Sequence, residues 1–438
     1  MHETRPAKIT SPVVSLGNGY VRTIPVAAIV AAVGIVLAIV FSGGLGARFM
    51  HAYLTNYAFL LSICLGCLFF VTIMHLTRAG WSVTLRRIAE LYAMCIIPMG
   101  LLFIPILCTV LMGSDILYPW VDGGWSMGDS SDPADVATAS FVNTLPVNER
   151  PPFEQLKHGF LNPGFFAIRW VIYFLIWGGM ASFFLFTSLK QDKTGEANLT
   201  HRMQAFAAPA MIVFASSLVF SSFDLEMSLE PFWFSTMFPV YFFAGAVLSA
   251  WSTITLTAFW LQRTGRVTDE ITVEHYHDMG KMMFGFIVFW GYIGFSQFLL
   301  IWYANIPEET FWYDWRINYP GWKTLSYILL IGHLFIPFLA MMGRTVRRNK
   351  NFMFGASIYL LVMHWVDHFW LVMPHYNLYV GGGVEGRGWP TVNLVADGAC
   401  MIGMIALFIA IFCVICRDRP LVALQDPRLG EALNHEVH

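Results

Sequence analysis

The stretch GYIGFSQFLLIWYANIPEETFWYDWR, at 291–316, joins an apolar helix to two adjacent carboxylates and a cluster of aromatic rings. Its apolar part extends back to position 282, and a run of that length can cross a hydrocarbon core of about 30 Å as a helix. Pro307 predicts the end of this helix, because proline cannot continue the hydrogen-bond ladder. The rings beyond it are typical of a headgroup-level aromatic belt. Glu308 and Glu309 are therefore expected at a membrane interface.

The composition of the whole chain agrees with this local pattern. The 438 residues are 57% hydrophobic and 12% charged, whereas soluble domains carry about 25% charged residues. Backbone groups in lipid need internal partners, so each apolar run is expected to be a helix. We predict an all-α integral membrane protein with ten transmembrane helices at 24–42, 52–76, 88–112, 165–189, 204–223, 233–261, 282–304, 323–343, 352–373 and 392–416.

The basic residues predict the orientation of these helices. Most of the 26 Lys and Arg residues fall in the connections on one side, for example Arg344, Arg347, Arg348 and Lys350. Such connections are cytoplasmic in most membrane proteins. Both termini are therefore expected in the cytoplasm, and the connection 113–164 and the Glu308–Glu309 pair on the opposite face. No basic block is long enough to indicate a nucleic-acid-binding protein.

A weak internal repeat predicts how the helices are grouped. The strings FDLEMSLEP (223–231) and VDHFWLVMP (366–374) end the fifth and ninth spans, and in each an aspartate precedes a proline by seven residues. Such a repeat suggests two bundles of equal topology. We expect one polytopic domain, 1–438, made of the segments 24–42 (helix one), 52–223 (first four-helix bundle, with the extracytoplasmic loop 113–164), 233–373 (second four-helix bundle), 392–416 (helix ten) and 417–438 (cytoplasmic tail).

Redox and nucleotide motifs are missing from the sequence. All seven cysteines lie inside apolar runs, which argues against disulfides and against a metal site in a loop. There is no C-x-x-C-H haem attachment sequence, no P-loop and no H-E-x-x-H zinc motif. We expect no metal and no redox cofactor on this chain, and we assign no catalytic residue. Electrons in any redox pathway would come from partner subunits.

Ionisable residues inside the predicted helices are the candidate functional groups, because each costs several kcal/mol in a membrane unless it is paired or hydrated. His364, Asp367 and His368 share one face of the ninth helix, where Asp367 can orient either imidazole. A proton relay or quinol-side acid–base group is one interpretation, and a structural hydrogen-bond cluster is the other. Asp224, Glu226 and Glu230 end the fifth helix and can be an acidic exit for protons or solvated charge at the headgroup level. His75, Glu90 and Asp278 lie near cytoplasmic helix ends and can form the mouth of an inner half-channel or simply cap and charge the helices. His333 and Asp397 can belong to a polar path or be buried groups that bond neighbouring helices.

Several longer strings resemble a known family. They are SSFDLEMSLEPFWFSTMFPVYFFAG (221–245), HDMGKMMFGFIVFWGYIGFSQFLLIWYANIPEETFWY (277–313), LVMHWVDHFWLVMP (361–374) and PLVALQDPRLGEAL (420–433). They resemble the NrfD/polysulfide-reductase-like membrane subunits, and most of all the ActF type found in alternative complex III. NPGFFAIRWVIYF (162–174) extends the similarity to the fourth helix.

The resemblance implies a subunit of a bacterial quinol:cytochrome c oxidoreductase in the inner membrane. Its implied partners are an NrfD-type sister subunit, a periplasmic iron–sulfur protein and c-type cytochromes, which would carry the iron–sulfur clusters and haem c. A quinone bound by this chain itself is a further possibility that the resemblance leaves open. Glu308, Glu309, Trp312 and Tyr313 would then form a docking contact for a periplasmic partner or a proton outlet.

Two other functions remain open from the sequence. The chain can be a purely structural anchor of such a complex, with the sister subunit performing the chemistry. It can also be a stand-alone secondary transporter, since repeats and buried charges occur there as well.

Overall fold

A computed structural model of the chain describes residues 15–16, 20, 22–121, 159–231, 233–379 and 394–436. Within these ranges, the side chains of 307, 308, 320, 377–379 and 394 are not described. Most of the predicted loop 113–164, from 122 to 158, lies outside the described residues. So does the side chain of Glu308.

The described chain is helical, as the composition predicted. Among the residues described no strand forms, and the single backbone bridge outside the helices joins Ser15 to Pro420. Ten segments are long and apolar enough to cross a membrane. The long helices are α1 (Thr23–Phe41), α2 (Ala47–Leu76), α8 (Pro163–Thr194), α9 (Asn198–Leu225), α10 (Phe238–Arg263), α11 (Val273–Ala304), α16 (Lys350–Tyr379) and α17 (Leu394–Cys416).

Two of the ten spans are chains of shorter helices. The third runs from Gly80 to Leu111 through η2 (Gly80–Ser82), α3 (Val83–Met94), α4 (Ile96–Leu102) and α5 (Ile104–Leu111). The eighth runs from Gly321 to Met341 through α13 (Pro320–Ile328), a π-helical segment η4 (Leu329–Phe335) and α14 (Ile336–Met341). Short helices complete the fold: η3 (Met227–Leu229), α12 (Pro307–Ile317), α15 (Arg344–Arg347) and α18 (Leu429–Leu433).

The prediction that Pro307 ends the seventh helix was wrong. Helix α11 ends at Ala304, where Asn305 adopts a left-handed conformation with φ of 50° and closes the helix. Pro307 instead opens α12. Proline suits that position because the first helical N–H needs no partner within the helix. The Glu308–Glu309 pair is thus part of a short helix between two membrane spans.

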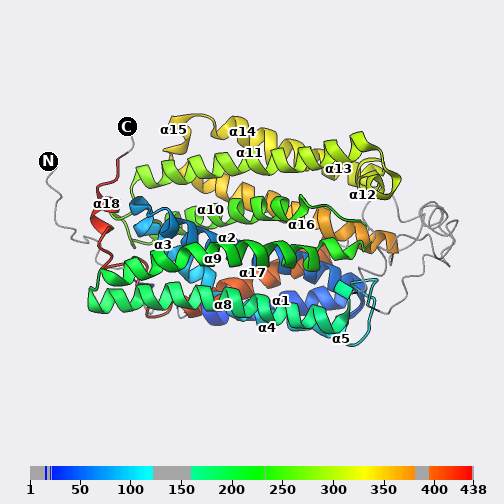
Figure 1. Ribbon diagram of the computed structural model, residues 1–438, viewed down its shortest axis with the longest axis horizontal. Helices are drawn as coiled ribbons and strands as arrows, with labels where there is room; N and C mark the ends of the chain where they lie inside the picture. The colour runs from blue at the N-terminus through cyan, green and yellow to red at the C-terminus, as the bar shows by residue number, and fades with distance from the viewer. Residues whose placement is uncertain are drawn as a thin grey trace.

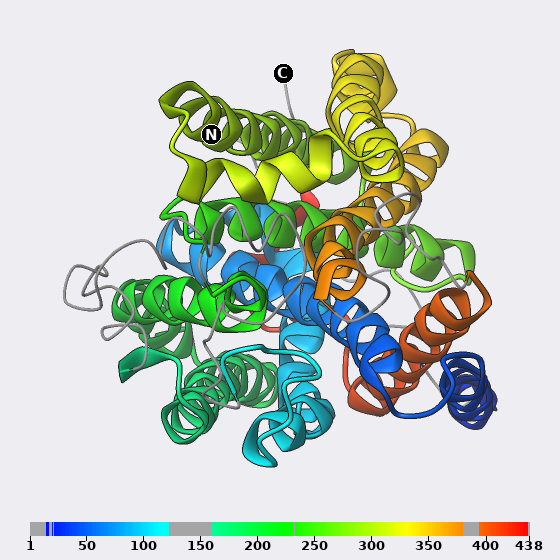
Figure 2. The ribbon, with the colours of Figure 1, turned by 90° about the vertical axis from the view of Figure 1, so that its right-hand side faces the viewer.

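Helices α2 and α10 form the centre of the bundle (Figure 2). They pack directly on each other, and α2 also contacts α3, α9 and α16. Gly66 permits the contact, because a Cβ there would lie 2.0 Å from the carbonyl oxygen of Ala246. Since α2 and α10 were assigned to different bundles, the division into two four-helix bundles stays a prediction. Helix α1 lies at the periphery beside α17 (Figure 2).

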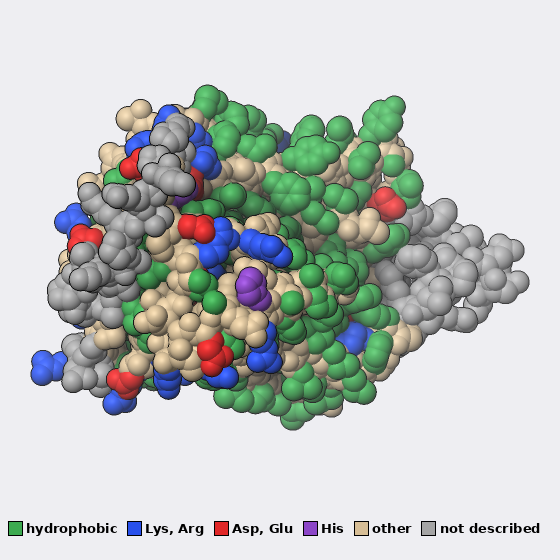
Figure 3. Space-filling view, turned by 60° about the vertical axis from the view of Figure 1, so that its left-hand side comes forward, with side chains coloured by type: hydrophobic (Ala, Val, Ile, Leu, Met, Phe, Trp, Pro, Cys, Tyr) green, Lys and Arg blue, Asp and Glu red, His purple; other side chains and the backbone are tan. Residues whose placement is uncertain are grey.

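The two ends of the bundle differ in chemistry. Helix α12 lies at one end, and α15 and α18 lie at the other (Figure 1). Lys and Arg side chains gather at the α15–α18 end, beside a broad hydrophobic surface (Figure 3). We call these the α12 end and the basic end. Which of them faces the cytoplasm stays a prediction.

Candidate functional site in the transmembrane bundle

A chain of hydrogen bonds joins three helices in the interior. His368 Nδ1 lies 2.6 Å from Glu226 Oε1, His368 Nε2 lies 3.3 Å from His364 Nε2, and His364 Nε2 lies 2.9 Å from Ser62 Oγ. The Ser62 hydroxyl donates to the carbonyl of Phe59. We call Ser62, Glu226, His364 and His368 the imidazole cluster. All four are almost completely buried.

The hydrogen-bond pattern assigns the protons in this cluster. The Ser62 hydroxyl uses its proton for the Phe59 carbonyl, so its oxygen accepts a hydrogen bond from His364 Nε2–H. The lone pair of His368 Nε2 faces the same His364 proton. His368 then carries its own proton on Nδ1 and donates it to Glu226. His364 Nδ1 and Glu226 Oε2 have no hydrogen-bond partner among the described residues. The cluster therefore keeps free sites that can accept a proton.

Asp367 faces a different pair of side chains. Tyr241, in the first turn of α10, donates to Asp367 Oδ1, and Trp290 Nε1 of α11 donates to Asp367 Oδ2 at 3.1 Å. Neither His364 nor His368 is bound to it, contrary to the expectation that Asp367 can orient one of them. Glu226 has that role instead, from a helix distant in sequence. Tyr241, Trp290 and Ser62 carry no charge, so the search for ionisable residues missed them.

His333 lies between these two groups. It belongs to the π-helical segment η4, a conformation that is rare and often marks a functional position. Its ring is fully buried, 4.1 Å from the Trp290 ring and 6.5 Å from the His364 ring, measured between centroids. Within the described part of the chain, neither of its nitrogens has a hydrogen-bond partner. His333 is thus an unsatisfied polar group beside the imidazole cluster.

Asp224 is paired more completely than its neighbour Glu226. Arg169 of α8 binds both of its oxygens, at 2.7 and 2.8 Å, and the Tyr173 hydroxyl donates to it at 3.0 Å. This bidentate contact neutralises the carboxylate and ties α8 to α9. Glu230 lies beyond the end of α9 and is also buried. The structure therefore separates Asp224, in a closed ion pair, from Glu226, in the imidazole cluster.

At the basic end, the candidates fall into two groups. Glu90 lies within 3.4 Å of Arg86 and 3.2 Å of Arg87, and Arg87 also contacts Asp192 at 2.5 Å. His75 stacks on Phe184, with ring centroids 5.2 Å apart.

Asp278 lies in the second group, 2.5 Å from Lys281 and 2.5 Å from His435. The C-terminal tail spans both groups, because Asp426 pairs with Arg86 while His435 pairs with Asp278.

Mostly apolar side chains of α2 lie between the imidazole cluster and the basic end. Between Ser62 and His75, α2 carries apolar side chains, two cysteines and Thr72, whose hydroxyl donates to Leu68 of its own helix. On α10, which packs against α2, Ser249, Ser252 and Thr255 are buried, and their hydroxyls donate to carbonyl groups of their own helix.

A further polar contact ties α17 to α2. Arg48 pairs with Asp397, and His51 Nε2 lies 2.9 Å from His375 Nδ1. The sequence placed Arg48 in a connection, but it begins a buried helix face. Asp397 therefore bonds a neighbouring helix.

The predicted docking aromatics are buried within the chain. Trp312 stacks on Trp233, with centroids 4.4 Å apart, and the Arg316 guanidinium lies 3.5 Å from its ring centroid. Trp233 in turn donates to the carbonyl oxygen of Glu309 at 3.1 Å. Trp312 and Tyr313 are 5% and 6% exposed, whereas Tyr303 at the end of α11 is 88% exposed. Trp312 and Tyr313 are therefore covered by the chain itself, whereas Tyr303 is at its surface.

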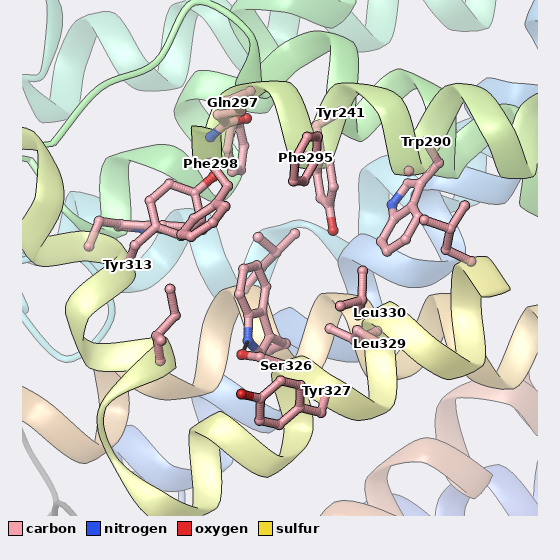
Figure 4. A pocket seen from close by; sticks show the side chains of 18 of the residues that line it. Tyr241, Trp290, Phe295, Gln297, Phe298, Tyr313, Ser326, Tyr327, Leu329 and Leu330 are labelled. Atoms are coloured by element: carbon pink, nitrogen blue, oxygen red, sulfur yellow. Dashed lines mark hydrogen bonds between the residues drawn. The ribbon is translucent and has the colours of Figure 1, made fainter. Parts of the chain in front are cut away.

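A cavity of about 340 Å³ lies against the Asp367 group. Its walls come from α10, α11, α12, α13, η4 and α16, and Tyr241 and Trp290 are among the lining side chains (Figure 4). Phe295 and Tyr327 also line it and are 56% and 53% exposed, so the cavity opens on the outer surface of the bundle. Burial raises the pKa of the Tyr313 phenol in the α12 wall, which keeps its hydroxyl protonated.

Comparison with protein-family models and with curated proteins finds no match for this chain. Function is therefore inferred from the geometry of the site, which has imidazoles and carboxylates in hydrogen-bond contact within an apolar bundle. Such a set can hold and move protons. The described residues contain no group of three or more His, Cys, Asp or Glu side chains placed to hold a metal ion.

Proposed function

We propose that this chain is the membrane subunit of a bacterial quinol:cytochrome c oxidoreductase of the alternative complex III type. In this respiratory-chain role it supports quinol oxidation by partner subunits and handles the protons of that reaction. The chain would span the inner membrane with both termini in the cytoplasm. Its partners would be an NrfD-type sister subunit, a periplasmic iron–sulfur protein and c-type cytochromes.

The main support for the proposal is the imidazole cluster. Glu226, His368 and His364 are ionisable groups inside an apolar bundle, where each costs several kcal/mol unless it is paired or hydrated. A cluster built only for stability would be expected to satisfy its polar atoms, as Arg169 and Asp224 do. In the part of the chain that the structure describes, the imidazole cluster instead leaves His364 Nδ1 and Glu226 Oε2 without hydrogen-bond partners.

The chemistry of quinol oxidation needs such groups. Each quinol that is oxidised gives up two electrons and two protons. The electrons would pass to haem c and iron–sulfur clusters of the partner subunits. Carboxylates and imidazoles of this chain would take up or pass on the protons.

A structural anchor is the second candidate, because the buried pair Arg169–Asp224 is closed and joins α8 to α9. Arg48–Asp397 joins α2 to α17 in the same way, although Arg48 Nε and Asp397 Oδ1 have no hydrogen-bond partner among the described residues. Pairs of this kind hold helices together without needing to exchange protons. If the whole chain acted in this way, substitutions in the imidazole cluster would alter assembly only.

Purification from native membranes tests the proposal. A tagged chain in mild detergent is expected to co-migrate with haem c and iron–sulfur proteins, whereas a stand-alone transporter would purify without them. Glu226→Gln, within the imidazole cluster, is then expected to lower proton-coupled turnover in a complex that still assembles. Normal turnover and proton release in that variant would leave the anchor function as the better account.

A further inference from the structure

The cavity beside Asp367 has the features of a binding site for a ligand that arrives from the membrane. Its volume of about 340 Å³ lies at the lower end of the range for small-molecule sites, roughly 300–1,000 Å³. The opening beside Phe295 and Tyr327 is on the bundle surface. A ligand can therefore enter sideways from the hydrocarbon region.

Aromatic side chains dominate the walls of the cavity. Phe298 and Tyr313 lie on one side in Figure 4, and Trp290 lies on the other, with Tyr241 between them. Planar rings prefer to pack against other rings, offset or edge to face. This shape favours a flat ring over a flexible hydrocarbon chain.

One wall also carries a polar group backed by a carboxylate. The Tyr241 hydroxyl donates its proton to Asp367, so its oxygen keeps lone pairs that can accept a hydrogen bond. Ser326, on α13, also lines the cavity, but its hydroxyl is already bonded to the carbonyl of Arg316 and to Trp370. Gln297 and Lys323 also line the cavity, but no hydrogen bond joins either of them to Asp367. Tyr241 therefore offers an oxygen-bearing ring a contact that is backed by a buried carboxylate.

We propose that this cavity binds the ring of a quinol, with a ring hydroxyl donating to the Tyr241 oxygen and the isoprenoid tail leaving past Phe295 and Tyr327. The inference deepens the proposed function and rests on it for the identity of the reaction, because it assigns a quinol site to this chain itself. A phospholipid tail would fill the same apolar space but would leave the Tyr241 oxygen unused.

Photolabelling of the detergent-solubilised complex tests the site. A short-tail azido-ubiquinone is expected to label peptides of α11 or α13, and excess decyl-ubiquinol is expected to protect them, whereas excess phosphatidylglycerol is not. Equal protection by the phospholipid would show a lipid tail in the cavity and overturn the proposal. Label placed only on helices that do not line the cavity would also overturn it.

Two cavity-filling variants sharpen the test. Leu330→Trp places a larger side chain in the cavity wall and is expected to lower labelling at least about tenfold. Leu339→Trp is the matched control, because Leu339 is exposed on α14 and does not line the cavity. If Leu330→Trp fails to fold, Phe295→Trp fills the same space from α11. Labelling that survives both substitutions would contradict the proposal.

The hydrogen bond to Tyr241 can be tested separately, by measuring ligand binding to a variant. Tyr241→Phe keeps the ring and removes the oxygen, and it is expected to weaken decyl-ubiquinol binding about threefold to tenfold, as for one lost hydrogen bond. Binding of the dimethyl ether of the same quinol, which has no hydroxyl to donate, should not change. An equal loss for both ligands would show that Tyr241 acts only through packing.

Co-purification separates this inference from the proposed function. A chain that purifies with haem c proteins but is not labelled in the cavity keeps the proposed function and loses the quinol site. A chain that is labelled in the cavity but purifies without redox partners keeps the quinol site and loses the proposed function.

Discussion

His368 Nδ1 lies 2.6 Å from Glu226 Oε1, which connects α16 to the end of α9 through two buried side chains that are 142 positions apart in sequence. The contact holds the first imidazole of the cluster in one orientation and leaves its second nitrogen facing His364. Substitutions on either side of this contact separate a proton-handling role from a purely structural one.

Glu226→Gln should lower turnover while the complex still assembles. Glutamine keeps a carbonyl oxygen for His368 Nδ1 but cannot exchange a proton as a carboxylate does. Glu226→Leu removes the acceptor altogether and should also destabilise the chain by about 1–3 kcal/mol. Turnover assays and thermal unfolding of the purified complex check both effects. Equal turnover in wild type and Glu226→Gln would limit the contact to a structural role.

Arg169→Met should be among the most destabilising substitutions in the bundle. It leaves Asp224 buried without its bidentate partner, and breaking a buried ion pair costs about 3–5 kcal/mol. The double variant Arg169→Met/Asp224→Leu removes both charges and should recover much of the loss. Thermal unfolding in detergent measures all three chains. A double variant as unstable as Arg169→Met alone would contradict this explanation.

Gly66→Leu should prevent normal packing of the bundle. A side chain at Gly66 meets the backbone of Ala246, which cannot move without separating α2 from α10. Overpacking usually costs about 1–3 kcal/mol, and a clash with backbone lies at the upper end of this range. Gly179→Leu is the control, since Gly179 is also helical and a Cβ there would meet no atom within 4 Å. Size-exclusion profiles of the two variants, measured side by side, give the comparison.

The orientation predicted from the basic residues can be read by cysteine labelling in intact cells. Asn318→Cys, at the end of α12, should react with a membrane-impermeant maleimide added outside. Lys193→Cys, in the last turn of α8, should react only after the inner membrane is opened. The wild-type chain is the control, because six of its seven cysteines are buried and the exposed one, Cys108, lies in a membrane span. The reverse pattern would place the basic end outside and contradict the prediction.

Much of the fold could be predicted from the sequence because lipid restricts the possible structures. An apolar run of about 20 residues has to form a helix so that its backbone groups are satisfied. All ten predicted spans correspond to helical segments of the structure. Their ends were less certain, because local signals compete there. Pro307, for instance, opens a helix after the left-handed Asn305 has ended the previous one.

The sequence also identified the ionisable residues at issue, since a charged or polar side chain stands out in an apolar helix. It grouped His364, Asp367 and His368 correctly on one helix, from their spacing. It could not assign their partners. Helical periodicity says which residues share a face, but it does not say which helix covers that face.

By itself, the sequence determined that this protein is a helical membrane protein with a small set of buried ionisable groups, because burial in lipid penalises unpaired backbone and charge at every position alike. Only the tertiary structure decided that Glu226 serves His368, that Arg169 closes off Asp224, and that Tyr241 stands between Asp367 and a cavity. Those pairings depend on the way α8, α9, α10, α11 and α16 pack together. They join residues that are far apart in the chain and have no local signal in common.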